Sequence, residues 1–154
     1  MSKVDGGGYM SDAYLTCSLC GKIPDLVKVE LLHSEERLPP EVDSLRCIGG
    51  SGNCSSPQIR VCPECGTYYG FIHEHDSEAG MGEGYTEEII SRITSERVLT
   101  VLEAARRDIA SSLKYWEQAL SEGNYVDHAR KMIVEEQAEL EQIDAEITRQ
   151  SEKT

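Results

Sequence analysis

Four cysteines, arranged as two widely separated pairs, are the residues of this chain best suited to chemistry. The first pair is Cys17 and Cys20 in CSLCG, and the second is Cys62 and Cys65 in CPECG. Each pair places two thiols three residues apart before a glycine, so the chain can turn tightly beneath a metal and direct backbone N–H groups toward the sulfurs. Two such pairs supply the four thiolates of a tetrahedral zinc site. The spacing predicts one structural zinc ion held by Cys17, Cys20, Cys62 and Cys65.

Other uses of these thiols are weaker alternatives. Buried or redox-active cysteines without a metal remain open, but neither pair precedes the helix that lowers a thiol pKa in thioredoxin-like sites. A zinc ion with four protein thiolates has no position left for the water that a hydrolytic zinc must activate. The chain also contains no nucleophile elbow, HExxH or Walker motif. We therefore expect that the protein is not an enzyme.

The remaining cysteines, Cys47 and Cys54, flank a glycine-rich turn at residues 49–53. A hairpin at this turn would bring the two thiols near each other. The sequence leaves three alternatives open for Cys47 and Cys54: two free thiols, a disulfide between them, or one of the two thiols as a metal ligand.

A second polar cluster is His73-Glu74-His75-Asp76. Alternation along a strand would place His73 and His75 on one face, within reach of one metal, and Asp76 could orient an imidazole. Two ligands do not make a metal site, and the sequence offers no third. The cluster is better interpreted as the solvated end of a strand.

Charge narrows the range of partners. The formal net charge is −13, and it is spread along the chain, with 15 acidic against 7 basic side chains up to Thr94 and 13 against 8 from Ser95 onward. Such a surface repels phosphate backbones, so we expect no nucleic-acid partner and favour a basic protein surface or self-association. No apolar run is long enough to cross a membrane, and the first twelve residues lack the apolar core of a secretory signal. Cysteines without an export signal favour the cytoplasm.

The first half of the chain must form the sheet that carries the cysteine pairs. Residues 1–12 are expected to be a flexible lead, and Ala13 to Lys22 an extended approach with the first cysteine turn. Beta-branched and aromatic residues in alternation indicate strands, whereas Pro39-Pro40 and acidic residues indicate an exposed loop at 34–43. The expected strands are 26–32, 44–48 and 67–73, with a hairpin tip at 49–53, a segment at 58–61 that leads into the second cysteine turn, and a loop at 78–84.

The hydrophobic period changes after Thr86. Thr86 can cap a short helix that begins at Glu87, and Thr94 or Ser95 can cap a longer one. Gly123 suits the left-handed residue that ends a helix. Two apolar stripes at intervals of three or four residues then predict an antiparallel helical hairpin, which must pack on the sheet, on another copy or on a partner. The stripes are Val98, Leu102, Ala105, Ile109, Leu113, Trp116, Leu120, and Val126, Ala129, Ile133, Leu140, Ile143, Ile147, with Glu136 where another apolar residue is expected.

These patterns predict an α+β fold in which a small antiparallel zinc-ribbon sheet is followed by an antiparallel α-helical hairpin. The expected parts are a flexible lead at 1–12, a zinc-ribbon-like β domain at 13–85 and a helical hairpin at 86–154.

The two cysteine turns resemble those of zinc-ribbon proteins, and the segment CPECGTYYGFIHEHD is similar to segments of small, largely uncharacterised bacterial proteins. The resemblance covers residues 14–76 and implies a ribbon fold and a structural zinc, but no particular activity. The 41-residue spacer between the pairs and the additional Cys47 and Cys54 depart from a compact ribbon. Our first hypothesis is a structural zinc-binding module whose acidic surface and helical hairpin mediate protein–protein contacts. The alternative is an immunity-type protein that neutralises a basic toxin or nuclease.

Overall fold

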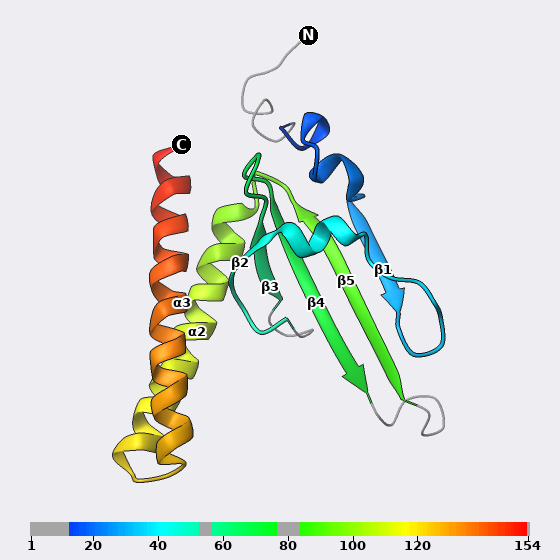
Figure 1. Cartoon of the computed structure of the whole chain (residues 1–154). Coiled ribbons are helices and arrows are strands. Elements are labelled where there is room, and N and C mark those ends of the chain that lie inside the picture. The colour runs from blue at the N-terminus through cyan, green and yellow to red at the C-terminus, as the bar shows by residue number, and fades with distance from the viewer. Residues whose placement is uncertain (1–12, 53–56, 77–83, 154) are drawn as a thin grey trace. The chain divides into compact units, whose positions relative to one another are not determined.

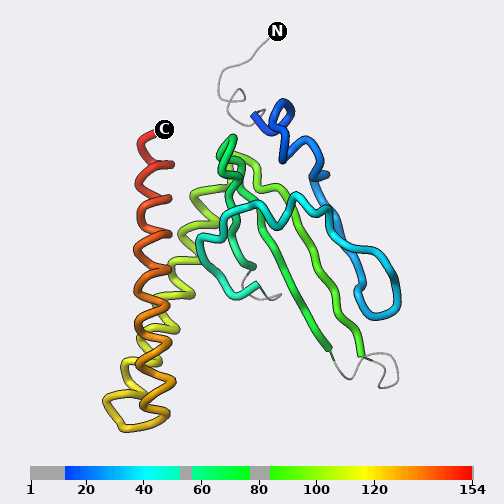
Figure 2. Tube along the Cα trace, viewed as in Figure 1, coloured from blue at the N-terminus to red at the C-terminus, as the bar shows by residue number. Residues whose placement is uncertain are grey.

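The structure of the chain is a computed structural model, which describes residues 13–52, 57–76 and 84–153. The fold is α+β and divides into two compact units. The sheet unit comprises the chain up to Cys47 and from Ser51 to Arg97, and the hairpin unit comprises Ile48–Gly50 and the chain from Val98 onward. Figure 1 shows their strands and helices, and Figure 2 traces the chain.

The sheet unit is built on a five-stranded sheet with the order β1-β5-β4-β3-β2. The pairs β1–β5, β5–β4 and β4–β3 are antiparallel, with Phe71 opposite both Gln58 on β3 and Ile90 on β5, so the predicted antiparallel sheet is confirmed. The long strands β4 and β5 run side by side in Figure 1. The strands are β1 (Leu26–Glu30), β2 (Arg46–Gly49), β3 (Gln58–Val61), β4 (Tyr68–Asp76) and β5 (Tyr85–Ile93).

The predicted short helix after Thr86 is wrong, because this segment is strand β5. It lies between β1 and β4, pairs with β4 along its whole length and with β1 from residue 87 to 91, and has Glu87 opposite both Glu30 and Glu74. Local capping by Thr86 favoured a helix, but two ladders of backbone hydrogen bonds and the burial of Ile90 and Ile93 decide for a strand. The helical part therefore begins at Val98 rather than at residue 86.

One face of the sheet carries the core of this unit. Its fully or nearly buried members include Tyr69 on β4 and Ile90 on β5, packed with residues from segments outside the sheet. The 3₁₀-helix η4 (Pro40–Ser44) supplies Val42, which is only 2% exposed. The prediction of an exposed loop at 34–43 is thus wrong at its end, since Pro40 starts a helical turn that buries an apolar side chain. The buried set is Cys20, Ile23, Val42, Leu45, Cys62, Tyr69 and Ile90.

The segment before β1 is also helical where an extended approach was predicted. It forms two 3₁₀ turns, η2 (Ala13–Thr16) and η3 (Cys20–Lys22). The guanidinium of Arg92 on β5 stacks 3.6 Å over the ring of Tyr14 and donates a hydrogen bond of 2.9 Å to the carbonyl of Ile23. Arg92 also pairs with Asp25. One buried side chain thus fastens both ends of this segment to the sheet.

The hairpin unit confirms the two apolar stripes. Helix α2 (Val98–Ser121) and helix α3 (Val126–Glu152) pack against each other and are joined by four residues. Gly123 has φ +76°, the left-handed conformation that was predicted to end the first helix. Leu102, Ala129 and Ile143 are completely buried.

Glu136, the exception in the second stripe, is buried as well. Its carboxylate accepts a 2.6 Å hydrogen bond from the Ser112 hydroxyl across the helix pair, but its Oε1 atom has no partner among the described residues. The end of β2 completes the unit. The backbone N–H of Gly50 donates to Glu139 at 3.2 Å, and Gly49 lies so close to Ile143 that a Cβ there would be 3.2 Å from its side chain.

Candidate metal centre

The structure brings together the four cysteines predicted as ligands. The thiol sulfurs of Cys17, Cys20, Cys62 and Cys65 all lie within 4.8 Å of one another. Across the two pairs, the sulfurs of Cys17 and Cys62 are 3.6 Å apart, and those of Cys20 and Cys65 are 3.5 Å apart. Tetrahedral ligands about 2.3 Å from one ion are about 3.8 Å from each other. The four sulfurs therefore have the spacing of a tetrahedral metal site.

The second cysteine turn, residues 62–66, is a tight loop between β3 and β4. The Gly66 N–H donates to the carbonyl of Cys62 at 3.0 Å, and the Cys62 N–H donates to Thr67 at 2.9 Å. Gly66 has φ +82°, a conformation that L-residues adopt only with strain. The N–H of Glu64 points at the Cys62 sulfur at 3.4 Å. The loop thus forms the predicted cradle, with its backbone directed at a thiol.

The first cysteine turn, residues 17–21, also directs a backbone N–H at a cysteine sulfur, but its backbone conformation is different. The N–H of Gly21 donates to the carbonyl of Cys17 at 2.9 Å, and the N–H of Cys20 points at the Cys17 sulfur at 3.5 Å. Gly21 does not have a positive φ, because this turn continues into the 3₁₀-helix η3. The two glycines that looked equivalent in the sequence therefore differ in how strongly the backbone requires them.

The protein around the sulfurs is partly apolar. Cys20 and Cys62 are 1% and 2% exposed, whereas Cys17 and Cys65 are half-buried. Burial raises the pKa of both Cys20 and Cys62. Burial acts the same way on Cys65, but hydrogen bonds from the Thr67 hydroxyl and backbone outweigh it and lower the pKa of that thiol. A bound cation supplies the positive charge that stabilises thiolates in such surroundings.

Tyr69 adds a buried hydroxyl to the core cluster that contains Cys20 and Cys62. Its side chain is completely buried, and its hydroxyl makes no hydrogen bond of standard geometry among the described residues. Burial raises the pKa of Tyr69, and its interaction with the neighbouring Cys20 raises it further. The hydroxyl is therefore a protonated donor beside a sulfur. It gains an acceptor when Cys20 is ionised by a metal, so the surroundings fit a thiolate-bound ion.

The outer side of the cluster is polar. The Ser18 hydroxyl donates to Glu64 Oε1 at 2.6 Å, which ties the first turn to the second. The same carboxylate oxygen is 3.8 Å from the Cys17 sulfur.

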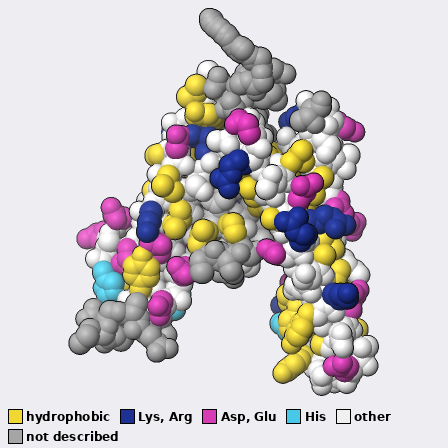
Figure 3. Space-filling model, turned by 180° about the vertical axis from the view of Figure 1, so that it is seen from behind, with side chains coloured by type: hydrophobic (Ala, Val, Ile, Leu, Met, Phe, Trp, Pro, Cys, Tyr) yellow, Lys and Arg dark blue, Asp and Glu magenta, His cyan; other side chains and the backbone are white. Residues whose placement is uncertain are grey.

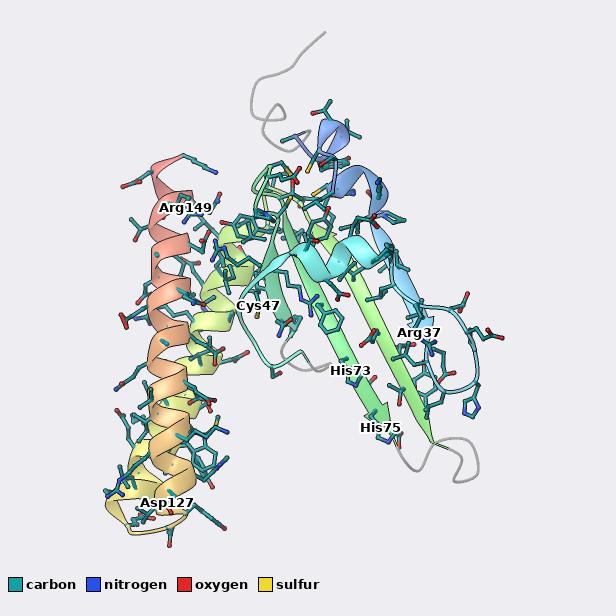
Figure 4. All side chains as sticks on the ribbon, in the orientation of Figure 1. Arg37, Cys47, His73, His75, Asp127 and Arg149 are labelled. Carbon is teal, nitrogen blue, oxygen red and sulfur yellow. The ribbon has the colours of Figure 1, made fainter. Side chains whose placement is uncertain are left out.

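The other candidate ligands do not join the cluster. Cys47 is a free, exposed thiol, and Cys54 lies outside the described residues. His73 and His75 share a strand face as predicted, but each has its own partner: His73 Nδ1 is 2.9 Å from Glu88, and His75 Nδ1 is 2.5 Å from the Thr86 hydroxyl. Figure 4 shows both near the end of β4. Within the described ranges, the four cysteines are the one group with metal-binding spacing.

Comparison with known proteins adds no relative: no protein-family model, no curated protein and no solved structure matches the chain. The resemblance to zinc ribbons therefore rests on the cysteine turns themselves. In the part of the chain that the structure describes, neither helix is long and apolar enough to cross a bilayer.

Proposed function

We propose that this protein is a structural zinc-binding module. The observation that carries the proposal is the cluster of four thiols with tetrahedral spacing, contributed by two segments that are 41 residues apart in the sequence. Zinc is the metal that such a set of four thiolates most often holds in proteins that have no redox chemistry. The ion would join the segment before β1 to the β3–β4 turn.

The proposed role of the zinc is structural rather than catalytic. Four thiolates fill its tetrahedral coordination, so no position is open to water or substrate. The buried core of the sheet unit includes Cys20 and Cys62 themselves. A metal bound there adds its binding free energy to folding of this unit. We accordingly propose that the protein is not an enzyme.

Metal analysis of the intact chain tests this proposal. We expect one zinc per chain, and cobalt in its place should give the absorption bands of tetrahedral thiolate coordination. Cys20→Ser should abolish stoichiometric binding, whereas Cys47→Ser, at an exposed thiol outside the cluster, should leave it unchanged. Wild-type protein without metal after expression in zinc-supplemented medium would overturn the proposal, as would equal zinc in both variants.

We further propose that the hairpin makes protein contacts. Tyr115 is 58% exposed, Tyr125 is 70% exposed and Val134 is 67% exposed. The Tyr115 ring packs edge-on against Trp116, which packs edge-on against His128 at 5.0 Å. Aromatic side chains that keep one end in water are the residue types enriched in interfaces. A partner chain, or a second copy, would cover these rings.

The acidic charge supports a basic protein partner over nucleic acid. In Figure 3, Asp and Glu side chains are scattered over the visible surface of each unit, interspersed with Lys and Arg. With a net charge of −13, the protein should be repelled by phosphate backbones. We expect no salt-dependent retention on DNA or RNA. The reduced thiols of the proposed site are compatible with a cytoplasmic location.

Sedimentation velocity of the full chain tests the hairpin contact. If the chain self-associates, Tyr115→Ser should weaken the association, while Ser121→Ala, at an exposed position of the same helix, should not. If the chain is a monomer, the same two variants are compared in cross-linking with cell extract from the native source. A contact that both variants retain at equal strength would contradict the proposed surface.

A further inference from the structure

A pocket with a volume of about 250 Å³ lies on the sheet unit, and no cysteine is part of its wall. Its wall includes Phe71 on β4, Val42 on η4 and Leu38 in the loop before η4. This volume is below the roughly 300–1,000 Å³ of pockets that take drug-sized molecules. The pocket therefore suits a ligand of about the size of one amino acid.

One side of the pocket is a fixed guanidinium. The Cζ atom of the Arg60 guanidinium lies over the Phe71 ring, 4.0 Å from its centre, so the charge contacts the face of the aromatic side chain. Its Nε donates to Gln58 at 2.7 Å, and its Nη1 donates to the carbonyl of Val42 at 3.3 Å. These contacts preorganise the group, but they leave its other amino nitrogen without a protein acceptor among the described residues.

Arg37 brings a second guanidinium to the same pocket, and Figure 4 shows it in the loop after β1. Its Nη1 donates to the backbone carbonyls of Ser34 and Glu36, at 3.2 and 2.6 Å. Neither Arg37 nor Arg60 forms an ion pair with a carboxylate in the described ranges. That is unusual in a chain with 28 acidic and 15 basic side chains, where acceptors are abundant.

Two carboxylates, those of Asp43 and Glu88, also line the pocket. Glu88 pairs with His73 at 2.9 Å, so it is held in place from outside the pocket wall. No pair drawn from these two acids and the two arginines closes to an ion pair among the described residues. Four charged side chains of both signs thus lie around an apolar wall without pairing with one another, and Glu88 pairs instead with His73.

We propose that this pocket binds a free amino acid with an apolar side chain. Its carboxylate would lie toward Arg37 and Arg60, its ammonium group toward Asp43 and Glu88, and its side chain against Phe71. An anion alone would meet the two acids, and a cation alone would meet the two arginines. Only a ligand with both charges satisfies all four groups, and the small volume limits it to one residue.

Ligand-observed NMR with the zinc-loaded full chain tests the proposal. The probe is an equimolar mixture of the twenty standard amino acids, and saturation transfer is expected to an apolar member. That amino acid is then compared with its N-acetyl form, which lacks the ammonium charge, and its C-terminal amide, which lacks the carboxylate. These two forms also imitate the last and first residues of a peptide. Each should bind at least tenfold more weakly.

Substitutions of Arg37 and Glu88 test whether these pocket residues bind the amino acid. Arg37→Gln, in an exposed loop, and Glu88→Gln should each weaken binding of the selected amino acid at least tenfold, while Arg130→Gln on the hairpin should leave binding unchanged. Zinc content and circular dichroism of all three should equal those of the wild type. Absence of saturation transfer to any amino acid would overturn the proposal. So would equal binding of the acetylated or amidated form, or unchanged binding in both pocket variants.

Discussion

Replacing Tyr69 with Phe removes one oxygen atom from the wall of the cysteine cluster, and the sign of its effect depends on the metal. In the metal-bound protein we propose, the hydroxyl donates to the Cys20 thiolate. A hydrogen bond to a charged group contributes about 1.5–3 kcal/mol to stability. Without metal, the same buried hydroxyl lacks a standard partner. Its removal should then cost nothing or relieve about 1 kcal/mol of desolvation.

The difference between these two effects equals the change in metal-binding free energy, because metal binding and folding are linked. The difference is a loss of about 1.5–4 kcal/mol, which corresponds to roughly 10- to 1,000-fold weaker zinc binding. Competition with a chromophoric chelator measures this ratio directly on the folded full-length protein. Urea denaturation with and without zinc gives the two stabilities separately.

Tyr115→Phe is the matched control, because it removes the same atom from a tyrosine that is 58% exposed on the hairpin. It should change neither zinc affinity nor the effect of zinc on stability. If Tyr69→Phe binds zinc as tightly as the wild type, the hydroxyl does not donate to a metal-bound thiolate. The orphaned donor would then no longer support a metal at Cys20.

Three further predictions address the backbone and the buried acids. Gly66→Ala should lower the free energy of unfolding, measured in urea, by about 1–2 kcal/mol, because Gly66 has a left-handed backbone conformation. Gly21→Ala should leave that free energy nearly unchanged, because φ of Gly21 is not positive and an added Cβ meets nothing within 4 Å. Replacing Ser112 with Ala and Glu136 with Met together should raise the free energy of unfolding by about 1–3 kcal/mol, seen as a higher urea midpoint, because a buried carboxylate whose Oε1 has no partner among the described residues is removed; a lower midpoint would contradict this. Burial raises the pKa of Glu139 above its ordinary 4.5, so the folded state binds the carboxyl proton more tightly than the unfolded state does. The stabilisation from the protonated group is therefore complete below pH 4.5. It is lost as the pH rises through the raised pKa of the folded state. Glu139→Gln should therefore melt at a higher temperature than the wild type at neutral pH and at nearly the same temperature near pH 4; a constant difference across a pH series would exclude this titration.

Much of the cysteine cluster could be predicted because its information is local. A thiol pair with a following glycine has a small set of backbone conformations, whatever the rest of the chain does. The helices from Val98 were predictable for a related reason, since their apolar stripes repeat over many turns. The position of Glu136 was also visible as a break in the stripe. The sequence could not reveal that Ser112 faces it.

The errors arose where distant partners decide the local structure. Thr86 followed by two glutamates satisfies the rules for a helix start, and the pairing with β1 and β4 that makes β5 a strand is invisible in a short window. Ile89, Ile90 and Ile93 were the signal for a strand, because β-branched residues are enriched there. The loop before η4 was judged from its prolines and acids. Val42 of η4 is buried because it packs in one cluster with Tyr69 on β4 and Ile90 on β5, which lie far from it in the sequence.

Three residues at the end of β2 and just after it determine how this protein can be divided for experiments. Ile48–Gly50 belong to the hairpin unit, although 47 residues of chain separate them from Val98. A fragment that starts at the first helix would lose the N–H that Gly50 gives to Glu139 and would expose Ile143 where Gly49 packs. If such a fragment were insoluble or unfolded, the cause would be the loss of residues 48–50 and not a property of the native hairpin. A faithful truncation must carry residues 48–50 along, for example by joining them through a linker to the start of α2.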